Sequence, residues 1–347
     1  MNKAVAVLIS DVHYNLKTID VANAAMTLAI NKAIELNVDL IVSGDLHDTK
    51  ANVRGECIIA INKTFTRRGL TIHVLRGNHD SLNEKSTEHS LHFLPVNCMV
   101  YSTPQKFERN MLHSLGVGYP DVYLVPYFHD ADELREYLKT VPPKSTLIMH
   151  QGIQGSNAGE YFQDKSALRP EDVAGFRVIS GHYHTRQTID LPDGGRWDYV
   201  GNPFTLNFAE ANDPIKGFQI LYDDGSLEFV PTNLRKHIVI ELDQLPYGQF
   251  ARGLDYKNVK ENDLVWVKVY GTKEDLQKLV KENIATNLGV KDFKLELIPD
   301  EVKTEVQHNL PTSQPELLDS LIDSLSNTTP AQKQRLKAIW KDLCDNA

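Results

Sequence analysis

The sequence has few cysteines and no long apolar run, and each absence excludes a class of protein. Its 347 residues include only Cys57, Cys98 and Cys344, which are odd in number and far apart, so no disulfide framework is implied. A reducing compartment, the cytoplasm, fits this cysteine usage. No apolar run reaches the roughly 20 residues of a transmembrane helix, and the N-terminus resembles a core strand more than a signal peptide. We therefore expect a cytoplasmic protein without membrane contact.

Excess positive charge is also missing. The formal net charge is -9 and the isoelectric point is about 5.8, which does not suggest nucleic-acid binding. Any DNA-binding face would have to be a local basic patch on an acidic background. With 41% hydrophobic and 24% charged residues, the composition is that of an ordinary globular protein, and the length indicates two or three domains.

The first two thirds of the chain alternate between apolar strand patterns and helix patterns. The expected strands cover residues 4–9, 38–42, 70–75, 122–125, 146–149 and 176–179, with helices at 18–36 and 52–67. This alternation favours parallel βαβ units in an α/β fold. Residues 197–200, 217–222 and 226–230 resemble antiparallel strands, and residues 223–225 supply a hairpin turn. We infer two sheets packed face to face with helices outside.

The remaining sequence predicts a smaller α+β unit and a helical tail. Strands are expected at residues 237–242, 264–270 and 293–298, and Thr272 is expected to cap a helix that runs to about residue 287. Residues 309–315 form a linker, followed by two amphipathic helices. Their apolar faces carry Leu317, Leu321 and Leu325, then Leu336, Ile339 and Leu343. The predicted domains are 1–234, 235–308 and 309–347.

Five short polar motifs follow apolar strands. They are Asp11-Val12-His13, Gly44-Asp45-Leu46-His47-Asp48, Gly77-Asn78-His79-Asp80, His150, and Gly181-His182-Tyr183-His184. Any one of them is ordinary turn chemistry, but five in a row at strand ends are not. Their oxygen and imidazole donors suit hard-to-borderline divalent metal ions, and the lack of thiolates argues against structural zinc. The set predicts two metal ions that hydrolyse a phosphate ester.

The motifs divide naturally between two metal ions. Ions about 3.5–4 Å apart need one ligand that bridges them, and Asp45 is central among the motifs. One ion is then completed by Asp11, His13 and His184, and the other by Asn78, His150 and His182.

His79 directly follows a predicted ligand, so its imidazole is expected to face the substrate and to donate a proton to the leaving oxygen or to stabilise charge. Asp48 is expected to hold that imidazole in the right tautomer. His47, in contrast, is interpreted as a surface loop residue. His79 and Asp48 are thus the predicted catalytic pair.

The order of these motifs resembles that of the calcineurin-like binuclear metallophosphoesterases, over roughly residues 5–231. The resemblance implies a four-layer α/β/β/α sandwich. Residues 199–203 (Tyr-Val-Gly-Asn-Pro), followed by Leu206, Phe208 and Glu210, are similar to a stretch of the SbcD-type DNA-repair nucleases, although Asn202 stands where serine is usual. That branch implies Mn²⁺ as the metal, with Mg²⁺ as the alternative. It also implies a small α+β capping domain and a helical C-terminus that binds an SbcC-type coiled-coil ATPase.

The preferred hypothesis is a metal-dependent nuclease subunit that hydrolyses DNA and is partnered by such an ATPase. The alternative is a stand-alone phosphoesterase that acts on nucleotides or other small phosphodiesters. A third hypothesis is a scaffold without activity, and the intact motifs count against it. A phosphoprotein phosphatase is disfavoured because Thr49-Lys50 follows the second motif where an arginine is typical. The sequence leaves the choice between a monomer and a homodimer open.

Overall fold

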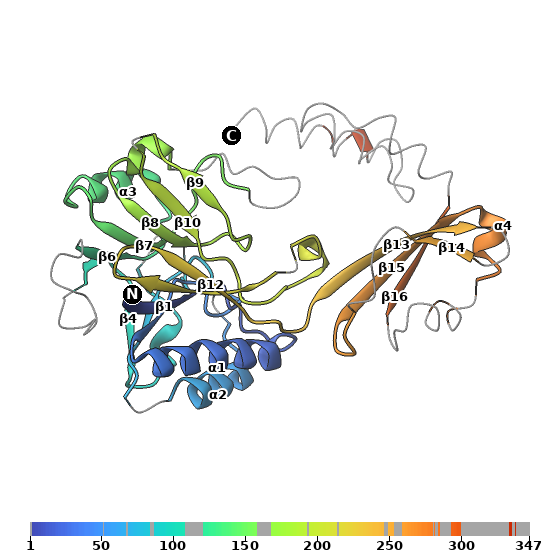
Figure 1. Cartoon of the computed structure of the whole chain (residues 1–347), viewed down its shortest axis with the longest axis horizontal. Coiled ribbons are helices and arrows are strands. Elements are labelled where there is room, and N and C mark those ends of the chain that lie inside the picture. The colour runs from blue at the N-terminus through green and yellow to red at the C-terminus, as the bar shows by residue number, and fades with distance from the viewer. Residues whose placement is uncertain are drawn as a thin grey trace. The chain divides into compact units, whose positions relative to one another are not determined.

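The computed structural model describes residues 2–50, 52–66, 69–83, 87–107, 121–157, 168–192, 194–213, 215–245, 249–252, 259–279, 281, 284, 293–299, 333, 334 and 337. The chain forms two compact units (Figure 1). One contains Met1–Val239 and Val259–Leu264, and the other contains Ile240–Asn258 and Val265–Ala347. Both mix helices and strands, as the sequence predicts. The six leucine and isoleucine residues of the predicted tail faces lie outside the described residues.

The first sheet of unit 1 has six strands in the order β12-β11-β1-β2-β3-β4. Their bounds are β1 Ala4–Ile9, β2 Asp39–Val42, β3 Ile72–Leu75, β4 Cys98–Tyr101, β11 Gly217–Tyr222 and β12 Leu227–Pro231. Strands β1 to β4 pair in parallel, while β11 pairs antiparallel with both β1 and β12. The predicted hairpin between β11 and β12 is confirmed.

The second sheet has the order β5-β6-β7-β8-β10-β9. Its strands are β5 Gln105–Lys106, β6 Val122–Val125, β7 Thr146–His150, β8 Arg177–Gly181, β9 Thr188–Asp190 and β10 Arg196–Tyr199. Strands β6, β7, β8 and β10 run parallel, with antiparallel β5 and β9 at the edges. The prediction that residues 197–200 run antiparallel to their neighbours therefore holds for β9 but is wrong for β8.

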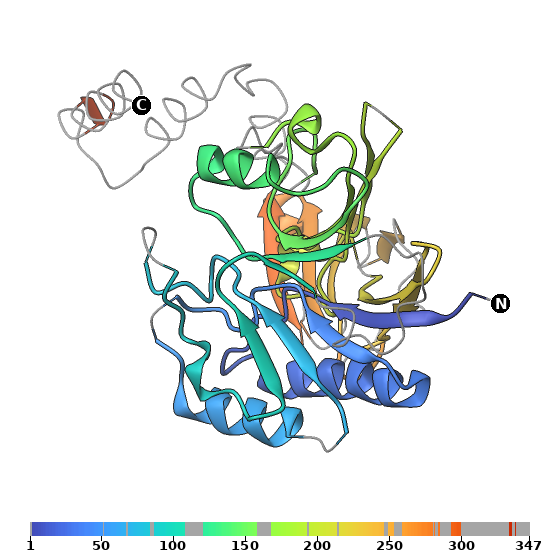
Figure 2. The same ribbon diagram turned by 90° about the vertical axis from the view of Figure 1, so that its left-hand side faces the viewer.

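Three apolar clusters form the core of unit 1. Helices α1 (Ile19–Leu36) and α2 (Gly55–Phe65) cover one face of the first sheet (Figure 2), and small residues such as Ala22 and Ala29 let α1 approach it closely. The second cluster lies between the sheets and includes Leu8 and Ile148. The third joins α3 (Ala131–Leu138) to the other face of the second sheet. Two large mixed sheets thus share an inner apolar layer.

Unit 2 contains a four-stranded sheet of order β14-β13-β15-β16. Its strands are β13 His237–Leu245, β14 Gln249–Arg252, β15 Leu264–Gly271 and β16 Lys294–Pro299, and β13 begins in unit 1. Thr272 accepts a hydrogen bond from Asp275 N and caps α4 (Lys273–Leu276), as predicted. The prediction that this helix continues to about residue 287 is wrong, because α4 ends at Leu276 and residues 277–279 are not helical. None of the helices that the structure describes is long and apolar enough to cross a membrane.

Candidate metal centre

The predicted site residues lie at the carboxyl ends of strands from both sheets of unit 1. Asp11 and His13 follow β1, Asp45 and Asp48 follow β2, Asn78 and His79 follow β3, His150 ends β7, and His182 and His184 follow β8. Parallel strands deliver their carboxyl ends to one edge of a sheet, and these two sheets pack face to face through a shared core. The structure brings all nine residues together at this edge.

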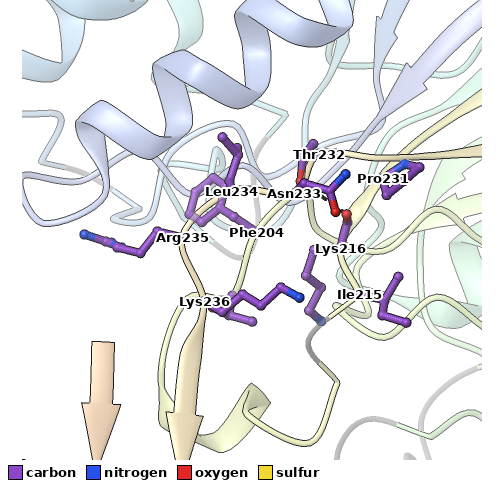
Figure 3. A pocket seen from close by; sticks show the side chains of 10 residues that line it. Phe204, Ile215, Lys216, Pro231, Thr232, Asn233, Leu234, Arg235 and Lys236 are labelled. Atoms are coloured by element: carbon purple, nitrogen blue, oxygen red, sulfur yellow. Dashed lines mark hydrogen bonds between the residues drawn. The ribbon is translucent and has the colours of Figure 1, made fainter. Parts of the chain in front are cut away.

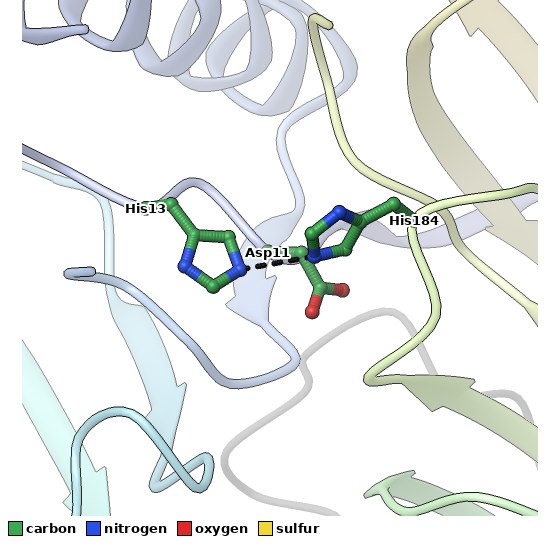
Figure 4. Close-up of side chains that lie close together, drawn as sticks. All are labelled: Asp11, His13 and His184. Atoms are coloured by element: carbon green, nitrogen blue, oxygen red, sulfur yellow. Dashed lines mark hydrogen bonds between the residues drawn. The ribbon is translucent and has the colours of Figure 1, made fainter. Parts of the chain in front are cut away.

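Asp11, His13 and His184 form the first group (Figure 4). Their ligand atoms all lie within 4.8 Å of one another, and the Nε2 atoms of His13 and His184 are 3.1 Å apart. The Asp11 side chain is fully buried and its Oδ2 accepts a hydrogen bond from the backbone N of His182 at 3.1 Å. Residues that follow β1 and β8, two strands of different sheets, thus share this group.

The second group surrounds the carboxylate of Asp45. Asp45 Oδ2 lies 3.3 Å from His150 Nε2 and 3.8 Å from His13 Nε2, so it lies between the two groups. Asn78 Oδ1 lies 3.2 Å from His150 Nε2 and 3.0 Å from His182 Nδ1. The structure therefore places Asp45 where a bridging ligand would be needed.

The hydrogen bonds of the imidazoles test whether these residues fit metal ions. His150 Nδ1 donates to the Ser43 carbonyl at 2.6 Å, so in the neutral ring Nε2 carries the lone pair. That lone pair faces two acceptors, Asp45 Oδ2 and Asn78 Oδ1. Acceptors that converge in this way need a cation between them, and the oxygen and nitrogen donors suit divalent ions. The residues fit the metal ions that the sequence predicts.

The charges of the site also indicate that a cation belongs between these side chains. Burial alone would lower the pKa of His150, but the carboxylates of Asp45 and Asp11 and the Ser43 carbonyl raise it to about 9. Burial would raise the pKa of Asp45, but the imidazoles of His150, His13 and His79 lower it. In the absence of metal, protons on His150 and His13, whose pKa values the carboxylates raise, balance the carboxylates. A divalent ion must displace them.

Several of the predicted ligands have an unusual backbone conformation. Asp11, His13, Asp45 and His182 have φ angles of 52°, 48°, 51° and 88°. Among the described residues, the other non-glycine residues with positive φ are Asn37, Lys144 and Asn233. Left-handed backbone is unfavourable for residues with a Cβ, and such strain gathers at functional sites. The left-handed conformation turns each of these four side chains towards the site directly after its strand ends.

Two glycines of the motifs are required by close approach. A Cβ on Gly44, whose φ is 94°, would lie 2.2 Å from His150 Nδ1. A Cβ on Gly181 would lie 2.0 Å from Ser10 Oγ and 2.4 Å from the Ser43 carbonyl oxygen. The motif glycines thus let β7 and β8 approach the ends of β1 and β2.

His79 is placed differently from the prediction in one respect. Its backbone N donates to Asp45 Oδ1 at 2.8 Å, and its Nδ1 donates at 2.6 Å to the backbone carbonyl of Asp48. The Asp48 carboxylate, which was expected to orient His79, instead lies 3.5 Å from His13 Nδ1 and accepts from Asn15 Nδ2. A carbonyl oxygen fixes the His79 tautomer as well as a carboxylate would, so its Nε2 is still the atom free to exchange a proton.

The comparisons with known proteins agree with this geometry. The calcineurin-like phosphoesterase family matches residues 5–186, which is more than half of the chain. The chain belongs to this family. It is therefore a metal-dependent phosphoesterase, a hydrolase related to nuclease subunits.

The phosphoesterase is similar to a curated protein and to a number of solved structures, of which one is described below. Exonuclease subunit 1 of enterobacteria phage T4 is 26% identical over 230 residues, which cover 62% of this chain and 60% of the relative. The match thus spans about three fifths of that protein's length. The structure described as GAP50, the anchor in the inner membrane complex of Plasmodium, is 14% identical, with a TM-score of 0.39, and the match covers 66% of this chain and 84% of that one.

Glu210 was not predicted as a site residue of the phosphoesterase, although it belongs to the stretch that carried the resemblance. Its Oε1 accepts from His184 Nδ1 at 2.8 Å, and its Oε2 accepts from Asn202 Nδ2 at 2.9 Å and from Leu206 N at 3.1 Å. Although burial opposes it, these contacts and Lys216 lower the pKa of Glu210 to about 2. A carboxylate therefore orients His184 so that Nε2 points into the first group.

Lys216 also contacts the His184 and Glu210 pair. Its Nζ donates to the His184 carbonyl at 3.0 Å and to Asp213 at 2.6 Å, and it lies 3.6 Å from Glu210 Oε2. The Lys216 side chain is 5% exposed and lines a small pocket with Phe204 (Figure 3). This lysine had no motif around it and was not foreseen.

Two further residues hold the motif loops of the phosphoesterase together. Asp80, fully buried, accepts hydrogen bonds from Leu46 N at 3.1 Å and Gly77 N at 2.9 Å, which ties the loop after β2 to the loop after β3. His47 is only 1% exposed and contacts Ser90 Oγ at 2.5 Å. The interpretation of His47 as a surface residue is therefore wrong.

Proposed function

We propose that this phosphoesterase is a Mn²⁺-dependent DNA nuclease, the catalytic subunit of an SbcCD-like repair and recombination complex. The single observation that carries the proposal is the pair of candidate ligand groups with Asp45 between them, which suits two metal ions. The T4 relative, whose name makes it an exonuclease subunit, supports a nucleic acid as the substrate, and we propose DNA. In this proposal the three apolar clusters correspond to an α/β/β/α sandwich, and unit 2 contains the capping domain.

The residues of the site supply the parts that hydrolysis needs. Asp11, His13 and His184 would hold one ion, and Asn78, His150 and His182 the other, with Asp45 shared. When bound, such ions lower the pKa of a coordinated water and stabilise charge on the phosphoryl oxygens. His79, with Nδ1 held by the Asp48 carbonyl, presents Nε2 as the proton donor for the leaving 3′ or 5′ oxygen.

The proposed complex includes an SbcC-like coiled-coil ATPase that binds the helices predicted within residues 309–347. The reducing cytoplasm is the proposed compartment, which suits the free thiols of Cys57 and Cys98. Apolar anchors at helical spacing, as in Leu317, Leu321 and Leu325, are what a partner groove recognises. Mg²⁺ is the alternative metal, because carboxylate and amide oxygens accept it as well.

A stand-alone phosphoesterase acting on nucleotides is the second candidate, favoured by the net charge of -9. To separate the two, the protein is incubated with Mn²⁺ and either end-labelled DNA or bis(p-nitrophenyl) phosphate. A nuclease digests the DNA, and Asp45→Asn abolishes activity on both substrates. Hydrolysis of the small ester without any digestion of single- or double-stranded DNA, alone or with the ATPase, would reject the nuclease in favour of the second candidate.

A further inference from the structure

A cavity of about 440 Å³ lies beside the metal centre and has no role in the chemistry described above. Its walls come from the ends of β3 and β6, the segment after β4 and the start of α3, and they include Arg76, Ser102, Pro104, Tyr127, His129 and Glu133. Ligand pockets of proteins have volumes in this range. The cavity is therefore large enough for a flat ring system with its sugar.

Two residues place the cavity next to the metal ligands. Arg76 immediately precedes Gly77-Asn78, and its Nη2 donates to the Tyr127 carbonyl at 2.6 Å. The Tyr127 ring has its centroid 5.6 Å from that of His182 and 6.2 Å from that of His150. Tyr127 is thus a wall shared by the cavity and the metal centre, so a group attached to the reacting phosphate can reach the cavity.

The charges of the cavity argue against a second phosphate as its ligand. The Arg76 side chain is buried, and its terminal nitrogens already donate to Ser81 Oγ and to the Tyr127 carbonyl. Asp130 and Glu133 lie on the rim with exposed side chains, and Asp130 Oδ1 caps α3. Carboxylates repel a phosphate but accept hydrogen bonds from the amino groups of bases.

The remaining surfaces suit a planar aromatic ligand. The rings of Tyr127 and His129 pack edge to face at 4.9 Å, and Pro104 and Pro126 add apolar surface. The neighbouring Phe128 ring stacks on Tyr137 of α3, which fixes this wall in place. Aromatic side chains beside a polar rim are the usual platform for unstacked bases.

We propose that this cavity is a subsite for one nucleobase of the substrate, the base next to the scissile phosphate. The proposal rests on DNA being the substrate. Binding the base there fixes the adjacent phosphate over the metal centre, and the carboxylates of the rim favour bases with an amino group over thymine.

The test compares a pocket-filling variant and a control variant on an intact oligonucleotide and two matched abasic ones. Ser102→Phe fills the cavity, whereas Thr103→Phe adds the same ring to the exposed neighbouring residue that does not line it. One substrate is an intact oligonucleotide. The other two have the same sequence with an abasic residue at one end or at the other. We expect Ser102→Phe to raise KM about tenfold or more for the intact oligonucleotide, but not for the abasic one that places the gap in the cavity. Thr103→Phe should leave all three unchanged.

Glu133→Gln is a second, milder variant on an exposed position of α3. It should raise KM for oligocytidine more than for oligothymidine, and equal effects would count against the proposal. The subsite is refuted if the wild-type protein does not distinguish intact from abasic DNA, or if Ser102→Phe impairs both equally. Failure of the proposed function is distinguishable, because the wild-type protein would then hydrolyse bis(p-nitrophenyl) phosphate and no DNA at all.

Discussion

Replacing Glu210 by glutamine should weaken the binding of one of the two metal ions and leave the binding of the other unchanged. In the native protein both carboxylate oxygens accept hydrogen bonds, Oε1 from His184 and Oε2 from Asn202 and Leu206 N. An amide has only one oxygen, so its NH₂ group must face a donor on one of these sides. Either His184 loses the partner that orients it, or the loop that carries Glu210 loses its anchor.

The size of the effect follows from the role of such partners. Removing the carboxylate behind a metal-binding histidine costs about 10–100-fold in metal affinity, which corresponds to about 1.4–2.8 kcal/mol. Calorimetric titration with Mn²⁺ should show one weakened site, the one that contains His184, and one unchanged site that contains His150. Glu136→Gln, on the exposed surface of α3, is the matched control and should change neither.

The variant should also change the response to acid. The pKa of Glu210 is about 2 in the folded chain, below its ordinary value of 4.5. The ionised group therefore stabilises the fold above pH 4.5, and this contribution is lost as the pH falls through 2. Because glutamine does not titrate, the Glu210→Gln variant should lack this part of the pH dependence of stability. Two sites of wild-type affinity in Glu210→Gln would refute the orienting role, and equal weakening of both would indicate a general structural defect instead.

Four other perturbations give distinct outcomes. Asp45→Asn should lose both ions as well as activity, and calorimetry that still finds two bound ions would overturn the bridging assignment. His79→Ala should keep both ions and lose about 10²–10⁴-fold in rate, with a smaller loss for an ester whose leaving group needs no proton; equal losses would point to charge stabilisation. Deleting residues 314–347 should preserve metal content and hydrolysis of a small phosphodiester while abolishing capture of the ATPase, which a pull-down measures; undiminished capture would contradict it. His89 accepts a hydrogen bond from Leu91 N, and burial lowers its pKa to about 4 from 6.5, so the unfolded chain binds more protons and stability should fall from pH 6.5 to 4. Urea unfolding of His89→Gln should show a shallower fall over that interval, and an unchanged slope would mean that His89 is not responsible.

The sequence was most informative where chemistry and strand ends coincide. The parallel strands before Asp11, Asp45 and Asn78 could be predicted because each is a short apolar run that stops at a polar motif. Since parallel strands align their carboxyl ends, the convergence of these motifs could be predicted as well. The edge strands β5 and β9 were missed, because two or three residues give too short a pattern.

Partners that depend on tertiary contacts could not be predicted in the same way. Glu210 lies 26 residues from His184, and nothing local shows that its carboxylate turns towards that ring. His79 is held by a backbone carbonyl, and because every residue has a carbonyl, a sequence pattern cannot single one out. Asp80 stands within a motif, yet only the folded loops reveal which backbone N–H groups it binds.

The left-handed backbone at Asp11, His13, Asp45 and His182 places two kinds of selection in opposition. Such a conformation costs about 1 kcal/mol or more for a residue with a Cβ, and glycine would adopt it without that cost. The backbone conformation alone would therefore favour glycine at all four positions. A chain that served only as a scaffold would not need the predicted ligands there, and with glycine in their place it could no longer bind the metal ions. Carboxylates and imidazoles at these four places are thus stability given up for chemistry, the mark of a working enzyme.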